Sequence, residues 1–140
     1  MDRLQKKTQF LTPALFASWG DALEAPIDCT TNWLHDDLHP YNILVNHGSF
    51  SGIIDWGDIT RGDISTDLVC IWMVFADSTA RQQALKTYGP ISEATRKRAI
   101  GWAILFGVVL LDTGLVDHPA HAVIGERALL ALCHDLRQSI

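Results

Sequence analysis

Cysteine is scarce in this sequence, basic residues are in the minority, and no hydrophobic run reaches membrane-spanning length. The three cysteines, Cys29, Cys70 and Cys133, are far apart and form no C-x-x-C pair. An odd, scattered set favours reduced thiols in a cytoplasmic protein over a disulfide framework. We therefore expect a cytoplasmic chain without structural disulfides.

The hydrophobic pattern argues against a membrane protein. The opening residues, MDRLQKKTQF, contain no apolar core of signal-peptide length. The longest apolar stretch runs from Ala99 to Leu111 and ends at Asp112, well short of the roughly 20 residues that a bilayer requires. We predict a buried core helix there and no membrane partner.

The composition fits one globular domain. Apolar residues make up 48% of the 140 residues, which excludes a disordered tail and provides a core able to fold without metal or disulfide staples. The 16 acidic and 11 basic side chains give a net charge of −5. Because no basic stripe is available to neutralise phosphates, nucleic acid is not expected as a partner.

The negative charge is concentrated between residues 35 and 67. This segment contains six aspartates and one arginine, so its formal charge is −5 and the rest of the chain balances to zero. The aspartates are Asp36, Asp37, Asp55, Asp58, Asp63 and Asp67. A charged site is therefore expected in this segment.

Periodicity and capping residues predict a mainly α-helical chain with a short β-hairpin. Thr12-Pro13 is typical of a helix start and Gly89-Pro90 of a helix end. The predicted helices are 13–23, 67–76, 78–88, 92–111 and 119–137, and the predicted strands are 33–35, 43–45 and 51–54. The expected N-caps of the middle three helices are Ser65 or Thr66, Ser78 and Ser92.

The hairpin is expected to bring oxygen-bearing side chains together. If Gly48 and Ser49 form its turn, Asn42 faces Asp55 across the two strands, about 5 Å away at the backbone. An amide and a carboxylate oxygen at that spacing suit Mg²⁺, which takes few protein ligands together with phosphates and water. Asp37, in the loop entering the hairpin, reaches the same space. Each of these residues taken singly also has a structural explanation in turns and caps.

Two spaced motifs flank the hairpin and match a known family. They are His35-Asp36-Asp37-Leu38-His39-Pro40-Tyr41-Asn42-Ile43-Leu44-Val45 and Gly52-Ile53-Ile54-Asp55-Trp56-Gly57-Asp58. Together they resemble the catalytic core of the aminoglycoside phosphotransferase family, small-molecule kinases that are distantly similar to protein kinases. The resemblance implies a protein-kinase-like C-terminal lobe. Its expected parts are a lead-in at 1–32, a catalytic loop and metal-binding hairpin at 33–58, and a helical subdomain at 65–140.

The resemblance implies a reaction and the residues that perform it. Asp37 would orient an attacking hydroxyl and accept its proton, while Asn42 and Asp55 would hold Mg²⁺ against the phosphates of ATP. The implied activity is transfer of the γ-phosphate to a hydroxyl of a small polar acceptor. The identity of that acceptor does not follow from the motifs.

Supporting roles are implied for four further residues. His35 would brace the catalytic loop from behind, and Asp67 would hydrogen-bond the backbone of that loop. Asp58 would support the metal site or cap a turn. His39 would approach substrate or phosphate, with an ordinary packing role in the loop as the alternative.

Two positions depart from the family pattern. The family usually has glycine where this chain has Asp36, and often glycine at Tyr41. Aspartate tolerates a left-handed backbone better than most residues, so we predict that Asp36 keeps the glycine geometry. Its charge would disfavour the transition state, and Tyr41 would narrow the acceptor side.

The resemblance covers only the C-terminal half of the family fold. An N-terminal lobe would supply strands over the adenine and a lysine for the α- and β-phosphates. The residues before His35 contain no glycine-rich strand–turn–strand, and their lysines are Lys6 and Lys7. We therefore expect a lobe with weak or absent kinase activity. The alternative is a non-catalytic half-kinase that dimerises, or pairs with an N-lobe partner, through its uncovered face.

Other patterns have weaker functional interpretations. His35, Asp37 and His39 also fit a hydrolytic zinc site, although a kinase loop explains the two histidines better.

Trp72, Trp102 and Phe106 lie on apolar helices and are expected in the core rather than in a sugar-stacking site. The basic run 96–98 is expected to form a solvated first helical turn.

Overall fold

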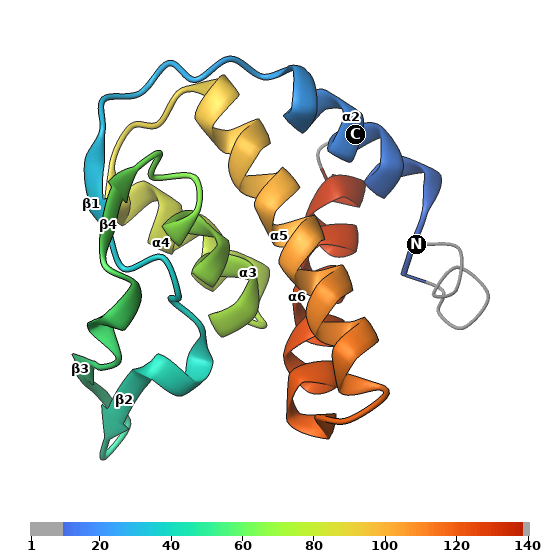
Figure 1. Ribbon diagram of the computed structural model, residues 1–140. Helices are drawn as coiled ribbons and strands as arrows, with labels where there is room; N and C mark the ends of the chain where they lie inside the picture. The colour runs from blue at the N-terminus through green and yellow to red at the C-terminus, as the bar shows by residue number, and fades with distance from the viewer. Residues whose placement is uncertain (1–9, 139–140) are drawn as a thin grey trace.

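The computed structural model describes residues 10–138, which form a mainly helical fold with two small antiparallel sheets (Figure 1). The helices are α2 (Pro13–Glu24), α3 (Cys70–Val74), α4 (Ser78–Tyr88), α5 (Glu93–Gly114) and α6 (Pro119–Gln138). The sheets pair β1 (Asn32–Leu34) with β4 (Thr60–Gly62), and β2 (Ile43–Asn46) with β3 (Ser49–Ile53). The predicted mainly helical chain with a hairpin is confirmed, whereas Lys6 and Lys7 lie outside the described residues.

Two of the predicted N-caps are confirmed and two are wrong. The hydroxyl of Thr12 accepts a hydrogen bond from the Leu15 N–H, and that of Ser92 accepts one from the Thr95 N–H. Helix α4 is capped by Asp77 instead of Ser78, because the Asp77 carboxylate lies one residue earlier and accepts from the Ala80 N–H at 2.9 Å.

The helix predicted at 67–76 is divided. It consists of a 3-10 turn, Asp67–Val69, followed by the short α3. Neither Ser65 nor Thr66 caps it, because both hydroxyls donate to Asp63 instead, to the carboxylate and to the backbone carbonyl respectively. The turn that begins at Asp63 therefore leads directly into Asp67.

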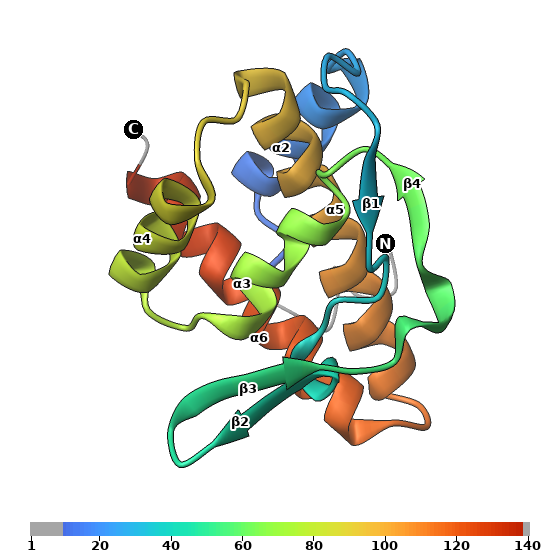
Figure 2. The same ribbon diagram turned by 90° about the vertical axis from the view of Figure 1, so that its left-hand side faces the viewer.

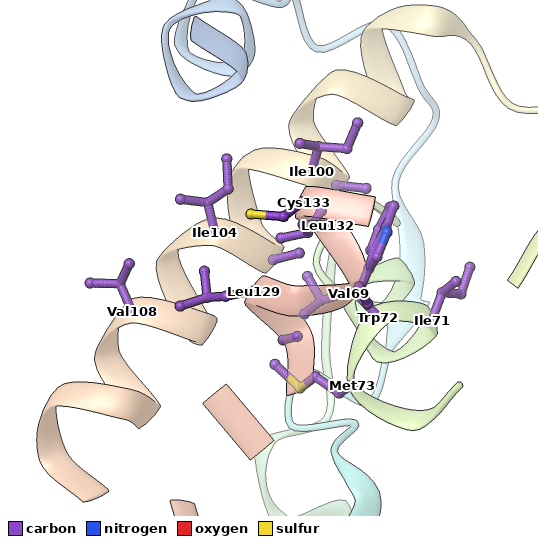
Figure 3. Close-up of a cluster of buried hydrophobic side chains, with 14 of the residues drawn as sticks. Val69, Ile71, Trp72, Met73, Ile100, Ile104, Val108, Leu129, Leu132 and Cys133 are labelled. Atoms are coloured by element: carbon purple, nitrogen blue, oxygen red, sulfur yellow. The ribbon is translucent and has the colours of Figure 1, made fainter. Parts of the chain in front are cut away.

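Helices α5 and α6 pack along each other and form most of the core. Figure 3 shows Ile104 and Val108 of α5 beside Leu129 of α6, with Trp72 of α3 joining the cluster. The buried helix predicted from the apolar stretch is confirmed and extends to Gly114. None of the helices in residues 10–138 is long and apolar enough to cross a membrane.

The aromatic residues on these helices differ in burial. Trp72 is almost fully buried and Phe106 is partly buried against the core, as predicted. The prediction for Trp102 is wrong, since 37% of this residue is exposed. It lies on the side of α5 that borders a groove rather than the core.

The α5–α6 contact depends on small residues, and substitution of Gly125 should test it. A Cβ atom at Gly125 would lie 2.5 Å from the backbone nitrogen of Leu111 and 2.6 Å from the carbonyl oxygen of Gly107. Gly125→Ala should therefore lower the free energy of unfolding by about 1–3 kcal/mol, despite the higher helix propensity of alanine. A Cβ atom at Gly20 in α2 would have no other atom within 4 Å, so Gly20→Ala should raise the free energy of unfolding by about 0.5–1 kcal/mol. Urea denaturation of both variants measures these two changes in the free energy of unfolding. Equal changes in the two variants would contradict the prediction for Gly125.

The β1–β4 ladder brings two distant segments together. No strand is predicted at residues 60–62, yet β4 pairs with β1 and places Trp33 opposite Arg61. The Arg61 guanidinium lies 5.6 Å from the centre of the Trp33 ring, a cation–π distance. Because the strands are antiparallel, the segment after β4 leaves at the end where β1 begins, and the Cys29 thiol donates there to Asp63 at 3.0 Å. The turn from Asp63 to Thr66 then brings Asp67 back to the loop after β1.

The predicted register of the β2–β3 hairpin is wrong. The turn is formed by His47 and Gly48, both with positive φ, and Asn46 pairs with Ser49. A positive φ at both central positions matches the right-handed twist of a hairpin, and glycine adopts it without strain. A bulge between Leu44 and Val45 shifts the pairing again further from the turn. Figure 2 shows this hairpin projecting from the helical body.

The bulged register changes what lies opposite Asn42. The Ile54 N–H donates to the Asn42 carbonyl at 3.0 Å, so Ile54, and not Asp55, is the facing residue. Asp55 follows one position later, at the same end of the hairpin as Asn42.

Candidate functional site

The loop after β1 is anchored by a carboxylate from a distant turn. The backbone N–H of His35 donates to Asp67 at 2.8 Å and that of Asp36 donates to the other oxygen of the same carboxylate at 2.9 Å. Hydrogen bonds to a charged acceptor are worth roughly twice those between neutral groups. Asp67 therefore fixes the backbone direction of the loop immediately before Asp37.

His35 is buried behind the loop. Its Nε2 lies 2.9 Å from the Ile54 carbonyl oxygen, and its Nδ1 accepts from the Asp37 N–H at 3.3 Å. The ring also meets the Trp56 ring edge-on, with centroids 4.7 Å apart. The imidazole thus connects the loop to the end of the hairpin, and its burial among these contacts leaves the zinc interpretation without support.

The backbone conformation predicted for Asp36 is confirmed, with a φ of 64°. Asp55 has a similar left-handed conformation, with a φ of 62°. Such a conformation costs a non-glycine residue about 1 kcal/mol or more, and it persists only where the surroundings enforce it. Each of the two motifs therefore contains one aspartate in this strained conformation.

Asn42 joins the end of the loop to Asp37. This buried residue donates from its amide nitrogen to the Asp37 carbonyl at 2.8 Å and to Asp37 Oδ2 at 3.1 Å. His39 Nε2 lies 3.4 Å from the same carboxylate oxygen. The Asp37 side chain remains 40% exposed, so it is held by the loop yet open to solvent.

The other ring nitrogen of His39 has a structural role. His39 Nδ1 accepts from the Tyr41 N–H at 3.2 Å and caps the 3-10 turn Pro40–Asn42. Tyr41, which is 55% exposed, packs edge-on against this ring.

Asp55 and Asp58 lie just after β3, at the end of the hairpin opposite its His47-Gly48 turn. Asp55 is exposed and precedes the 3-10 turn Trp56–Asp58, of which Asp58 is the last residue. The indole N–H of Trp56 donates to the Ile53 carbonyl at 3.1 Å and stabilises this turn. Asp55 is thus carried by a defined turn at the same end of the hairpin as Asn42.

The donor atoms at this site fit a hard cation with few protein ligands. Within residues 10–138, no group of three or more His, Cys, Asp or Glu side chains is arranged to hold a metal. The Asn42 amide nitrogen donates to Asp37, so the amide oxygen of Asn42 faces away from Asp37. One amide oxygen and one exposed carboxylate match the sparse oxygen set that Mg²⁺ takes when phosphates and water complete its shell.

The solvated position predicted for Arg98 is wrong. It is expected in a solvated turn, but it is only 8% exposed and forms an ion pair with Asp63, with Nε 2.5 Å from Oδ2. Asp28 lies 3.3 Å from the same guanidinium, which also donates to the Pro26 carbonyl. Arg96 and Lys97 are exposed, as expected.

The environment of Asp63 keeps it ionised. Burial raises the pKa of this carboxyl, but hydrogen bonds from Arg98, Cys29 and Ser65 outweigh burial and hold the pKa well below its usual range. The hydrogen bond to Asp63, together with burial, raises the pKa of the Cys29 thiol. All three cysteines are free, so the expectation of no disulfide is confirmed.

Asp63 links Arg98 to the loop formed by residues 35–42. Its carbonyl accepts the Thr66 N–H at 3.2 Å and its carboxylate accepts the Ser65 N–H at 3.1 Å, which closes the turn before Asp67. Asp67 follows this turn directly and holds the loop at His35 and Asp36, so the short segment from Asp63 to Asp67 connects Arg98 of α5 to that loop.

The comparisons with known proteins define the class. The profile of the phosphotransferase enzyme family matches residues 2–102, and the chain belongs to this family. Among solved structures, a thermostable mutant of aminoglycoside phosphotransferase APH(4)-Ia in its apo form is similar, with 20% sequence identity and a TM-score of 0.46. The match covers 90% of this chain and 46% of that one, so the chain spans about half the length of this relative. The comparison with curated proteins gives no significant match.

Proposed function

We propose that this chain is the catalytic lobe of an ATP-dependent phosphotransferase that transfers a γ-phosphate to a hydroxyl of a small acceptor. The observation that carries the proposal is the Asp37–Asn42 pair, joined at 3.1 Å in a loop whose backbone is fixed by Asp67. Membership of the phosphotransferase enzyme family supports it. The same loop would correspond to the kinase catalytic loop, in which the aspartate accepts the substrate proton.

The proposed step uses Asp37 as the general base. Asp37 would accept the proton of the acceptor hydroxyl while the hydroxyl oxygen forms a bond to the γ-phosphorus and the bond to the β–γ bridging oxygen breaks. The products are a phosphate ester and ADP. The Asn42 amide, which donates to Asp37 Oδ2, would hold the carboxylate in the orientation that this transfer requires.

Asn42 and Asp55 would hold Mg²⁺ through the amide oxygen and the carboxylate. When bound, this ion neutralises the charge of the phosphate oxygens. Asp58, the last residue of the 3-10 turn that Asp55 precedes, would support Asp55, and His35 would support this turn through its edge-on contact with Trp56. We propose weak or absent transfer by the 140-residue chain alone, because residues 10–138 contain no sheet of the kind that covers adenine in kinases.

A second candidate function is favoured by exposed apolar side chains on the hairpin and the segment after it. They are Val45, Phe50, Trp56 and Ile59, each between 49% and 68% exposed. Exposed apolar side chains of this kind often mark a surface that binds protein. The chain would then act as a half-kinase that dimerises or pairs with an N-lobe supplied by another chain.

Calorimetric titration of Mg·ATP into the 140-residue chain separates the two candidates. We expect a Kd of about 1 mM or tighter, weakened at least tenfold in Asp55→Ala and unchanged in Asp117→Ala, an exposed aspartate in the turn before α6. Asp37→Ala should still bind Mg·ATP and should lose any phosphate transfer that the wild-type chain shows. Absence of binding in the wild-type chain would overturn the first candidate, and a dimer in light scattering of that chain would establish the second.

A further inference from the structure

A groove of about 640 Å³ lies between α2, α5 and the β1–β4 ladder. Its volume is within the range of sites that bury small organic ligands, about 300–1,000 Å³. The lining is largely apolar: Trp19, Leu23, Ile27, Leu34, Trp102 and Leu105. The two indoles are partly exposed here, which leaves flat apolar surface available to a ligand.

The groove offers little charge to a polycation. Asp63 and Arg98 both line it, but they neutralise each other through the 2.5 Å ion pair. The remaining carboxylate on the lining is that of Asp36, which is exposed. Threonine hydroxyls at positions 60 and 66 complete the polar part of the surface.

Asp36 belongs both to the lining of the groove and to the loop formed by residues 35–42. It lines one part of the groove and directly precedes Asp37, so the two Cα atoms are about 3.8 Å apart. Asp37 itself does not line the groove, so a ligand whose apolar part lies against Trp19 and Trp102 would have to extend past Asp36 to bring a polar end to the residue proposed as the general base.

We propose that this groove binds the phosphate acceptor, and that the acceptor is a hydroxyl compound with an apolar ring or chain rather than a polycationic aminosugar. The proposal rests on the phosphotransferase function proposed above and names the acceptor class of that same site. The apolar part is recognised by the indoles and by Leu23. A single donor group of the acceptor is recognised by the Asp36 carboxylate, and the hydroxyl extends toward Asp37.

The test uses the 140-residue chain labelled with ¹⁵N and two probes, 2-(2-naphthyl)ethanol and kanamycin. We expect the naphthyl alcohol to shift the indole N–H signals of Trp19 and Trp102 in a saturable way, and kanamycin to leave them unmoved. Leu23→Glu should weaken the alcohol at least tenfold. Leu23 is 66% exposed, so the substitution is compatible with folding, and Ile27→Glu, at a site 76% exposed, provides a second variant.

Val123→Glu is the matched control, since Val123 is 57% exposed on α6 and lies outside the groove. It should bind the alcohol as the wild type does. Equal weakening by Leu23→Glu and Val123→Glu, or saturable kanamycin binding with no response to the alcohol, would overturn the inference. Phosphate transfer to kanamycin with the groove empty would overturn the acceptor class and leave the phosphotransferase function standing. Alcohol binding in a chain that does not bind Mg·ATP would establish the groove as a ligand site and overturn both the phosphotransferase function and the acceptor role inferred here.

Discussion

Arg98→Met is expected to lower the free energy of unfolding by about 3–5 kcal/mol. The substitution keeps an aliphatic side chain of similar length but removes the guanidinium that pairs with Asp63 at 2.5 Å and contacts Asp28. Breaking one side of a buried ion pair leaves the partner charge without compensation, and this residual charge is the main cost. Since small domains have only about 5–15 kcal/mol of stability, the loss should be evident in urea denaturation.

Arg96→Met is the matched control for this prediction. Arg96 lies on the same helix, is exposed, and contacts Glu93 at 3.4 Å across one helical turn. An exposed pair of this kind contributes only about 0.3–0.5 kcal/mol, so the control should remain within about 0.5 kcal/mol of the wild type. Similar losses in the two variants would show that Arg98 contributes no more than a surface arginine.

The acid limb of the stability profile provides an independent readout of the same ion pair. The pKa of Asp63 is lower in the folded chain than its ordinary value, so its contribution to stability is fully present above about pH 4. That contribution is lost as the pH falls through the lowered, folded-state pKa, because the unfolded state then binds the proton more readily. The wild type should therefore lose stability below about pH 4 more steeply than Arg98→Met. Equal slopes of stability against pH in the wild type and in Arg98→Met would show that Arg98 does not lower the pKa of Asp63.

The parts of the fold that are governed by local sequence could be predicted. Thr12 and Ser92 cap helices through atoms three residues away, and the helix at 99–111 lies in the core because it is apolar on nearly all sides. The left-handed backbone at Asp36 was also predictable, since the family usually has glycine at this position and aspartate tolerates a left-handed backbone better than most residues.

The errors involve choices that local patterns do not determine. A two-residue turn at His47-Gly48 and one at Gly48-Ser49 differ by a single step, but the step and the bulge near Leu44 move Asp55 away from its predicted position opposite Asn42. Register in a short exposed hairpin is weakly specified by sequence, because neither face is firmly buried.

The burial of Arg98 depends on distant partners. Three consecutive basic residues suggest a solvated turn, but helical spacing sets Arg98 on the same face as Thr95 and Gly101, both of which are buried. This spacing was the one sequence feature that indicated the burial of Arg98. The partners themselves, Asp28 and Asp63, come from separate loops, and only the folded chain brings them to this helix.

Asp67→Asn is expected to release the loop that carries Asp37. One carboxylate accepts hydrogen bonds from both the His35 and the Asp36 N–H, and each oxygen serves one donor. Asparagine offers one oxygen and one NH₂ group, so one backbone donor would face another donor. With bonds to a charged acceptor worth about 1.5–3 kcal/mol each, we expect a stability loss of about 2–3 kcal/mol.

The decisive readout for Asp67 is local rather than global. Amide hydrogen exchange at His35 and Asp36 should become at least tenfold faster relative to amides in the α5–α6 core, which a uniform loss of stability would not produce. Asp117→Asn, at an exposed position outside the site, should change neither exchange nor stability. Because Asp36 has a left-handed backbone at φ 64°, the loop has strain to release once its anchor weakens, and Asp37 should move with it. A displacement of about 1 Å at a reacting group is sufficient to reduce a transfer rate about 100-fold. Unchanged exchange at both amides would mean that the β1–β4 ladder alone holds the loop, and that Asp67 is dispensable for positioning Asp37.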